Sequence, residues 1–366
     1  MKILLVSQVP PDFELKRKSN EIFPEFQAQA MWLRALRGLG HQVTVFLYSD
    51  PVLIPKKVNA RFHQISSSFF PRIYNKYRLT KNHHYALFPE NLVKSFKLSR
   101  LIAHCRPDKI IISGGISELV SLPFKTARKL GIPIYLLHGV NPLVGATRFE
   151  TDVIGYFDWV ITNDPSHARE WKKLGAKNAR ALPYAGIDPA IHHKVKLTPS
   201  EYRQLKADVV FVGTLFADKQ QTLLHLTNQQ FNFKIWGKIP SDTKLEPRLQ
   251  PYYKGEAWGR ETVKIYNAAK IVLNLVPDHM PIGGNMRTFE IPGSGAFQLA
   301  NRCPRAWYEP DKEIVLFNST DDLKKKVKYY LANPQKRRQI ARAGFKRTHR
   351  DYTYKERFRV LLSELD

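Results

Sequence analysis

Short apolar runs alternate with amphipathic stretches along this chain, and the alternation occurs twice. In the first half, runs such as residues 3–7 and 109–113 are almost wholly aliphatic, and the stretches between them carry apolar residues at helical spacing. A run that is apolar at nearly every position indicates a strand buried on both faces, as in a parallel sheet covered by helices. The pattern restarts near Asp208. We therefore expect two α/β domains, each a doubly wound, Rossmann-like parallel sheet.

The expected elements define the domain boundaries. In the first half we expect strands at 3–7, 42–48, 109–113, 132–137, 159–162 and 180–183, and helices at 25–39, 91–104, 119–130 and 166–174. In the second half we expect strands at 209–212, 233–236, 271–275 and 296–300, and helices at 219–228 and 262–269. Gly40 and Gly131 are the stop signals of two helices. The predicted domains are 1–190, a polar linker at 191–207, a second domain at 208–335, and C-terminal helices at 336–366 that pack back toward the first domain.

Charge and cysteine content narrow the class of protein. The 366 residues carry a net charge of +26 and contain two cysteines, which excludes a disulfide framework and favours a reducing cytoplasm. Residues 51–110 hold twelve Lys and Arg against two acids, and residues 323–366 hold fourteen against four. Such an excess suits nucleic acid, an anionic membrane surface or an anionic substrate, or it belongs to solvated faces. No apolar run approaches the 18 residues that a membrane span needs.

Residues 281–300, PIGGNMRTFEIPGSGAFQLA, contain the strongest functional signal. They read as a glycine loop, a short helix and a buried strand. Backbone N–H groups at a helix N-terminus attract anions, and Glu290, about two turns into that helix, could accept hydrogen bonds from sugar hydroxyls. Phosphate and ribose together indicate a nucleotide. The alternative is an ordinary turn followed by a solvated glutamate.

Several stretches together resemble one enzyme family. In the first half they are residues 3–7 through Gly40, residues 158–162, and the run PYAGID at 183–188; in the second half they are residues 211–215 with Lys219, NMRTFE at 285–290 and EIVLF at 313–317. On these residues the whole chain resembles the family-4-like glycosyltransferases of the two-Rossmann, GT-B fold. It is most similar to the glycosyltransferase-like branch of the spore maturation proteins.

The resemblance implies roles for the matched positions. Glu290 takes the place of the second glutamate of the family's Glu-x7-Glu motif, which holds the ribose, and Lys219 takes the place of the lysine that contacts the diphosphate. His138, at a strand end, takes the place of a histidine that approaches the donor sugar; alternatively, it caps its turn. The expected catalytic residues are His138 and Glu290, and the expected nucleotide-sugar-binding residues are Gly213, Thr214, Lys219, Gly237, Gly283, Gly284, Asn285, Met286, Arg287, Thr288 and Glu290.

Three positions depart from the family pattern. Ile282 stands where the first glutamate of the motif is expected, and Thr214 stands where an arginine usually contacts phosphate. Phe23-Pro24 replaces the N-terminal Gly-Gly. Arg287, near the helix N-terminus, could supply the missing phosphate cation.

The chemistry follows from these residues. Lys219, Arg287 and a helix N-terminus could stabilise a leaving nucleoside diphosphate, so we expect no metal and no cofactor beyond a UDP- or GDP-linked donor sugar. The resemblance favours retention of configuration. Inversion would need a base near the acceptor, for which Asp12, Glu14, Glu21 and Glu25 are candidates. The histidine pairs at 83–84 and 192–193 are expected to be solvated, and no metal site is expected there.

The acceptor is expected to bind the first domain. Residues 51–90 interleave cations with aromatic residues, a pattern that suits a membrane interface, nucleic-acid stacking or ordinary packing. We expect a glycosyltransferase that acts on a glycan, a lipid-linked or another anionic acceptor. It would be cytoplasmic, with an anionic membrane surface as a further partner; nucleic acid is the less favoured partner. The alternatives are an inactive GT-B-fold protein that binds anionic polymers and a nucleotide-sugar epimerase.

Overall fold

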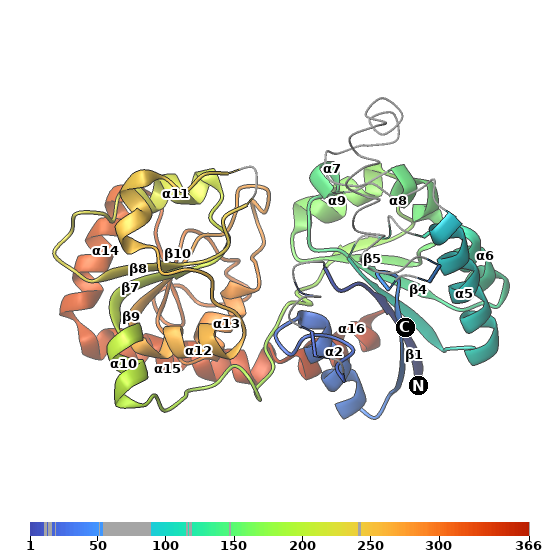
Figure 1. Ribbon diagram of the computed structural model, residues 1–366, viewed down its shortest axis with the longest axis horizontal. Coiled ribbons are helices and arrows are strands. Elements are labelled where there is room, and N and C mark those ends of the chain that lie inside the picture. Colours follow the sequence, from blue (N-terminus) through green and yellow to red (C-terminus); the bar gives the residue numbers. More distant parts are fainter. Residues whose placement is uncertain are drawn as a thin grey trace. The chain divides into compact units, whose positions relative to one another are not determined.

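The computed structural model describes residues 1–10, 13, 17–18, 20–50, 52–53, 89–114, 116, 119–145, 148–240 and 243–365. They form two compact units, Met1–Tyr184 with Phe358–Asp366, and Ala185–Arg357 (Figure 1). The expected linker, residues 191–207, lies within the second unit, where helix α10 (Pro199–Leu205) occupies part of it. No helix in the described part of the chain is long and apolar enough to cross a membrane.

The first unit is built on a six-stranded sheet in the order β2-β1-β3-β4-β5-β6, with every neighbouring pair parallel. Alternate aliphatic side chains of its strands pack on helices α5, α6 and α9, and Leu4, Ile112 and Leu136 are fully buried there. The strands are β1 (Lys2–Ser7), β2 (Gln42–Leu47), β3 (Lys109–Ser113), β4 (Ile134–Leu137), β5 (Trp159–Thr162) and β6 (Ala179–Ala181). The helices are α2 (Ala28–Gly38), α5 (Pro89–Cys105), α6 (Leu122–Lys129), α7 (Pro142–Gly145), α8 (Arg148–Val153), η1 (Ile154–Tyr156) and α9 (Pro165–Lys173).

Local sequence explains how these helices begin and end. Asp164 accepts a hydrogen bond from the backbone N–H of Ser166 at 2.8 Å and caps α9, and Pro165 follows at the first helical position. Gly40 and Gly131 follow α2 and α6 with φ angles of +83° and +68°, which glycine adopts without strain. Both glycines therefore act as the stop signals that the sequence predicts.

The second unit has a five-stranded parallel sheet in the order β11-β10-β9-β7-β8. One face packs on α11 and α14, and the other packs on α12 and α13 (Figure 1). The strands are β7 (Ala207–Val212), β8 (Phe233–Trp236), β9 (Ala269–Asn274), β10 (Gln298–Ala300) and β11 (Val315–Leu316). The helices are α10, α11 (Ala217–Leu224), η2 (Pro247–Tyr252), α12 (Arg260–Ala268), α13 (Arg287–Gly293), α14 (Thr320–Ala332) and α15 (Pro334–Asp351).

The C-terminal helix α16 (Tyr354–Glu364) leaves the second unit and enters the first. Phe358 packs edge-to-face on Trp32 of α2, with ring centroids 5.5 Å apart. The Tyr135 hydroxyl donates a hydrogen bond to the carbonyl of Leu365 at 3.2 Å. The expected fold class, two Rossmann-like parallel-sheet domains with C-terminal helices, is confirmed.

Candidate functional site

The predicted donor-site residues of the second half gather at the carboxyl ends of parallel strands. Gly213 follows β7, Gly237 follows β8, and the loop after β9 leads into α13. In open α/β sheets this edge is where ligands bind, because loops rather than paired backbone surround it. The fold therefore gives these residues a common location that their spacing in the sequence does not show.

Glu290 lies in the first turn of α13, so the expectation that it lies about two turns into the helix is wrong. The reason is local: Gly283, Gly284 and Asn285 stay outside the helix, which begins only at Arg287. The Glu290 carboxylate is 5% exposed, and its Oε2 accepts a hydrogen bond from Nη1 of Arg287 in an i,i+3 ion pair. Burial raises the pKa of Glu290, but Arg287 and His192 more than offset this and leave the pKa below its usual value.

Arg287 connects α13 to the end of β7. Its Nε–H donates to the carbonyl of Val212, the last residue of that strand, at 3.3 Å. Burial disfavours the charge of the guanidinium, yet the attraction of Glu290 prevails and raises the pKa of Arg287. A permanent cation is therefore held at the carboxyl end of β7.

Lys219 supplies a second cation on α11, the helix that follows β7. It is 8% exposed, and its Nζ lies 5.2 Å from the ring centroid of Phe216. Burial lowers the pKa of Lys219 to about 8; Asp218 opposes this shift, and the positive charge of Arg287 adds to it. Two cations that repel one another at a sheet edge provide suitable electrostatics for a diphosphate.

His192 is a site residue that the sequence analysis missed. We expected His192 and His193 to be solvated, but His192 is 5% exposed, and its Nε2 lies 3.9 Å from Oε1 of Glu290. The expectation is therefore wrong for His192, because a turn closed on Asp188 directs its ring inward. Only its position four residues after the PYAGID run could have drawn attention to it. Residues 83–84 lie outside the described part of the chain.

The glycine loop is held by a chain of side-chain hydrogen bonds. Asn274 Nδ2, at the end of β9, donates to the Thr288 hydroxyl at 3.2 Å, and Oδ1 of Asn285 accepts from the Thr288 backbone N–H at 3.2 Å. Thr288 is fully buried, whereas Met286 is half-buried against an aromatic cluster. A Cβ on Gly284 would lie 2.7 Å from the Thr288 hydroxyl and 2.8 Å from the Trp307 ring. Thr288 thus holds the loop from behind, and glycine is required for its close approach.

The remaining second-unit positions lie at the ends of β7 and β8. The backbone N–H of Gly213 donates to the carbonyl of Trp236 at 3.0 Å, and that of Gly237 donates to the carbonyl of Gly255 at 2.9 Å. Thr214 is half-buried beside Gly213.

The loop before α13 contains the last two of these positions. Gly283 is buried, and Ile282, which replaces the family's first glutamate, is 43% exposed. An apolar side chain at that exposure is not needed for the core.

His138 lies in the other unit, directly after β4, at the carboxyl end of the first sheet. It is 4% exposed; its Nδ1 is 3.0 Å from the carbonyl of Val140, and its ring packs edge-to-face on Trp171 at 5.1 Å. Its Nε2 lies 3.8 Å from Oε1 of the fully buried Glu150. Burial lowers the pKa of His138 to about 4, so the imidazole is neutral at physiological pH. Its role as a donor-site residue remains a prediction.

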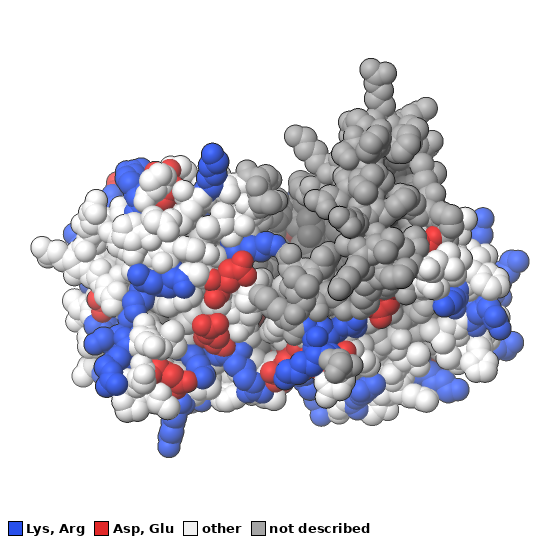
Figure 2. All heavy atoms as spheres, in the orientation of Figure 1, with Lys and Arg blue, Asp and Glu red and all other residues white. Residues whose placement is uncertain are grey.

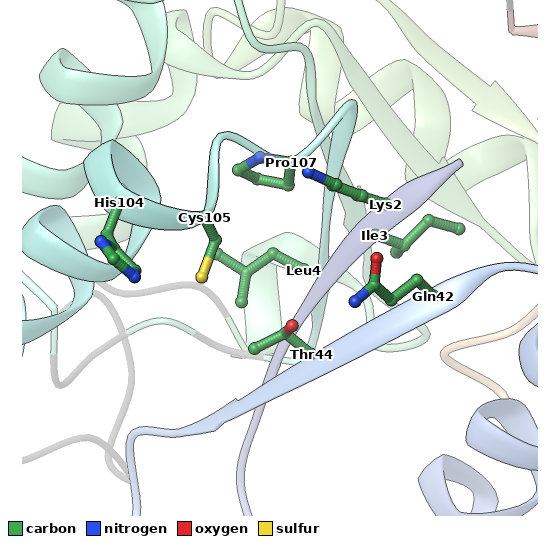
Figure 3. A pocket seen from close by; sticks show the side chains of 8 residues that line it. All are labelled: Lys2, Ile3, Leu4, Gln42, Thr44, His104, Cys105 and Pro107. Atoms are coloured by element: carbon green, nitrogen blue, oxygen red, sulfur yellow. The ribbon is translucent and has the colours of Figure 1, made fainter.

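Two of the pockets in the described part of the chain lie in the first unit. One, of about 480 Å³, is lined by residues of the loop after β1 and of α2, including Glu21, Glu25 and Arg37. The other, of about 210 Å³, lies near the first residues of β1 and β2 and the end of α5 (Figure 3); it is lined by Lys2, Ile3, Leu4, Gln42, Thr44, His104, Cys105 and Pro107. Because the smaller pocket lies at the amino ends of the strands, it is remote from His138.

No group of three His, Cys, Asp or Glu side chains in the described part of the chain is placed to hold a metal ion. Asp12 and Glu14, two of the candidate bases for an inverting reaction, lie outside the described residues. Most of residues 51–90, the segment predicted to bind an acceptor or a membrane surface, also lie outside them. Glu21 and Glu25 are described, and both line the larger pocket of the first unit.

The chain is similar to several known proteins. Residues 219–363 match the model of a family described as glycosyl transferase-like. Spore protein CgeB of Bacillus subtilis (strain 168) is 25% identical over 243 residues, which cover 62% of this chain and 73% of that protein. The crystal structure of Anabaena Alr3699/HepE in complex with UDP has a TM-score of 0.64 at 14% identity, covering 100% of this chain and 99% of that one. Sucrose-phosphate synthase (tll1590) from Thermosynechococcus elongatus has a TM-score of 0.60 at 12% identity, with the same coverages.

These matches test the family resemblance and the fold that we expect from the sequence. The predicted resemblance to GT-B glycosyltransferases, and to the spore-protein branch among them, is confirmed. The solved structures are only 12% and 14% identical in sequence to this chain, so they support the fold alone. The family match falls mainly on the second unit, where the predicted donor-site residues lie.

Proposed function

We propose that this chain, a glycosyltransferase of the GT-B fold, transfers a sugar from a nucleoside diphosphate to an acceptor, with the nucleotide bound by the second unit. The observation that carries the proposal is the grouping of Lys219, Arg287 and Glu290 at one edge of the second sheet. Two cations suit the diphosphate, and a carboxylate suits the ribose hydroxyls. The Anabaena structure holds UDP, so a UDP-linked sugar is the first donor to test and a GDP-linked sugar the second.

In the proposed reaction the protein stabilises the negative charge that develops on the leaving diphosphate. Arg287 keeps its charge at any physiological pH, and Lys219 gains charge when an anion approaches, because the anion favours the ammonium form. Both act without a metal ion, so we propose a metal-independent transfer. Retention of configuration belongs to the same proposal, since the leaving phosphate can then take the acceptor's proton and no enzymic base is required.

For the acceptor we propose the first unit. Its larger pocket carries both signs of charge, with Lys18, Arg34 and Arg37 beside Glu21 and Glu25. Such a surface suits hydroxyl-rich glycans and anionic groups better than purely apolar molecules. The neutral ring of His138 donates its Nδ1–H to the carbonyl of Val140, so Nε2 could only accept a hydrogen bond from a sugar hydroxyl. The ring carries no charge for general acid catalysis at pH 7.

An anionic membrane surface is the further partner we propose. Arg338, Arg342 and Lys346 are exposed at i,i+4 spacing on α15, so they form one row along the helix. Lys and Arg are spread widely over the described surface in Figure 2, with Asp and Glu in smaller groups.

Changing Arg338, Arg342 and Lys346 to Gln should reduce sedimentation of the protein with anionic vesicles and leave its low binding to neutral vesicles unchanged. Equal sedimentation of the variant and the parent would contradict this proposal. The two free cysteines suit a cytoplasmic location.

One observation favours a second candidate, a GT-B-fold protein that binds its ligand without turnover. The family's first glutamate is replaced by Ile282, which is exposed at the same loop, so a contact to the donor sugar is lost or made differently. A nucleotide-sugar epimerase is the remaining alternative, and it would convert the donor without needing an acceptor.

The decisive experiment combines binding with turnover. UDP, GDP and their sugars are titrated into the protein by calorimetry, and release of free nucleotide is then measured with and without glycan and lipid-linked acceptors. We expect the protein to bind one of these nucleotides, and we expect Glu290→Gln to weaken that binding about tenfold or more. Glu261→Gln, at an exposed position on α12, should leave the affinity unchanged. Acceptor-dependent nucleotide release supports transfer. Binding without release identifies the inactive protein, and epimerised donor without acceptor identifies the epimerase.

A further inference from the structure

His192 occupies a turn that fixes its ring inside the second unit. The backbone N–H groups of Ile191 and His192 donate to the carbonyl of Asp188 at 2.9 and 2.8 Å. The Asp188 carboxylate accepts from the N–H of Ala190 at 2.9 Å. Immediately before this turn, the backbone of Ile187 bonds with Tyr352 and Tyr354. The ring of His192 is therefore held by a closed turn anchored at its start.

Two backbone groups of Asp188 lie close to Nδ1 of the His192 ring. The backbone N–H of Asp188 donates to Nδ1 of His192 at 3.2 Å. The carbonyl oxygen of Asp188, which can only accept, also lies 3.3 Å from Nδ1, so the backbone contacts fit either tautomer. The carboxylate of Glu290 faces Nε2 and can only accept, so we assign the proton of the neutral ring to Nε2. That N–H faces Oε1 of Glu290 at 3.9 Å, longer than a direct hydrogen bond but close enough for electrostatic attraction.

The two oxygens of Glu290 therefore have different partners. Oε2 is bound by Arg287 of the same helix, and Oε1 faces the Nε2–H of His192. The charged groups around the imidazole are Glu290 and Arg287 on α13 and Asp188 in its own turn. Burial lowers the pKa of His192, and Glu290 only partly offsets this, so the ring stays neutral at pH 7 and offers one donor.

We propose that His192 is a positioning residue that holds the Glu290 carboxylate for a ribose hydroxyl and thereby makes the site prefer ribonucleotides over 2′-deoxyribonucleotides. The inference rests on the proposed donor site. His192 itself touches no reacting atom in this proposal. Its effect passes through Glu290, so it depends on the sugar of the nucleotide and not on the phosphates.

The test uses three probes and three variants. UDP, 2′-deoxy-UDP and pyrophosphate are titrated by calorimetry into the parent protein, His192→Phe and His192→Gln. Phe keeps the ring volume without the donor, and the Gln amide restores an N–H near the position of Nε2. His193→Phe is the matched control, because His193 is half-buried and its Nδ1 bonds only locally, 3.1 Å from the Pro189 carbonyl.

We expect His192→Phe to weaken UDP about tenfold, with 2′-deoxy-UDP and pyrophosphate changed less than about twofold. His192→Gln should regain UDP affinity to within about threefold of the parent. Equal losses for all three probes would show that His192 only supports the fold of α13, and an unchanged UDP affinity would remove the proposal altogether. If the parent protein binds neither UDP nor GDP, the proposed function itself is contradicted. This outcome differs from one in which the parent binds UDP and the His192 variants bind it equally well.

A measurement without any ligand tests the same geometry. The nitrogen chemical shifts of His192 in the parent protein should show the proton on Nε2 and the lone pair on Nδ1. Glu290→Gln should shift the Nε2 resonance, and Glu261→Gln should leave it in place. A proton on Nδ1 would overturn the assignment, because Nε2 would then have no N–H to direct at Glu290.

Discussion

A Cβ placed on Gly237 would lie 1.7 Å from the carbonyl oxygen of Gly213, so the backbones after β8 and β7 touch at the carboxyl edge of the second sheet. Gly237 also has a φ angle of +153°, which L-residues with side chains rarely adopt. Both glycines were predicted as ligand-binding positions. The contact gives them a structural reason as well, because it brings the two loops of the candidate site together.

Gly237→Ala should therefore lower the free energy of unfolding by about 3 kcal/mol or more, since the backbone of Gly213 is held beside β8 by the hydrogen bond from its N–H to the Trp236 carbonyl. Urea denaturation measures the change. Gly255→Ala is the matched control: Gly255 has a φ of +96° and no atom within 4 Å of an added Cβ, so only backbone strain of about 1 kcal/mol is expected. Similar losses in the two variants would contradict the contact.

Lys219 should make nucleotide affinity depend on pH. Its pKa is lowered to about 8, so the free protein carries this charge below pH 8 and loses it above. A bound diphosphate favours the ammonium form, so binding takes up a proton above pH 8 and becomes weaker. We expect UDP affinity to fall about tenfold between pH 8 and 9.5. Lys219→Arg should make UDP affinity independent of pH over this range. Calorimetry at each pH measures the affinity, and a parent protein whose affinity does not change with pH would contradict the proposal.

Arg287 and Glu290 should behave as a coupled pair in stability measurements. Arg287→Met leaves a buried carboxylate without its cation, which should destabilise the protein by about 3 kcal/mol. Adding Glu290→Gln to that variant should recover a large part of the loss, because the uncompensated charge is gone. Both variants should bind UDP poorly. Additive losses in thermal and urea unfolding would show that the two side chains do not interact.

His138 should make the first unit sensitive to acid. Its folded pKa of about 4 lies below the usual value of 6.5, so the unfolded chain takes up the proton first as the pH falls. The stability contributed by the neutral ring is complete above pH 6.5 and is lost between pH 6.5 and 4, by up to about 3 kcal/mol. His138→Gln should lose less stability over this range in urea denaturation, whereas His104→Gln, at an exposed position on α5, should follow the parent.

Much of the fold could be predicted from the sequence. Strands β3, β5 and β8 match the expected strands at every residue, because strands covered by helices on both faces of a sheet are mostly apolar. Element ends were less accurate, as at β4, which begins at Ile134 instead of 132. Strand β11 and helix α10 were missed. The first has two residues, and the second depends on a capping box of Thr198 and Glu201 inside a polar segment.

Of the candidate site, the sequence by itself determined the residue types and their order along the chain: a lysine after the first strand of the second sheet, and a glycine loop that leads to Arg287 and Glu290. The tertiary structure alone decided which residues distant in the sequence interact. It joined Arg287 to the Val212 carbonyl at the end of β7 and brought His192 to Glu290 from 98 positions earlier in the chain. The pair of Arg287 and Glu290, in contrast, follows from their i,i+3 spacing once the helix begins at Arg287. The physical reason is that periodicity encodes burial against a sheet, whereas the partner of a buried charge depends on which loops meet at the sheet edge.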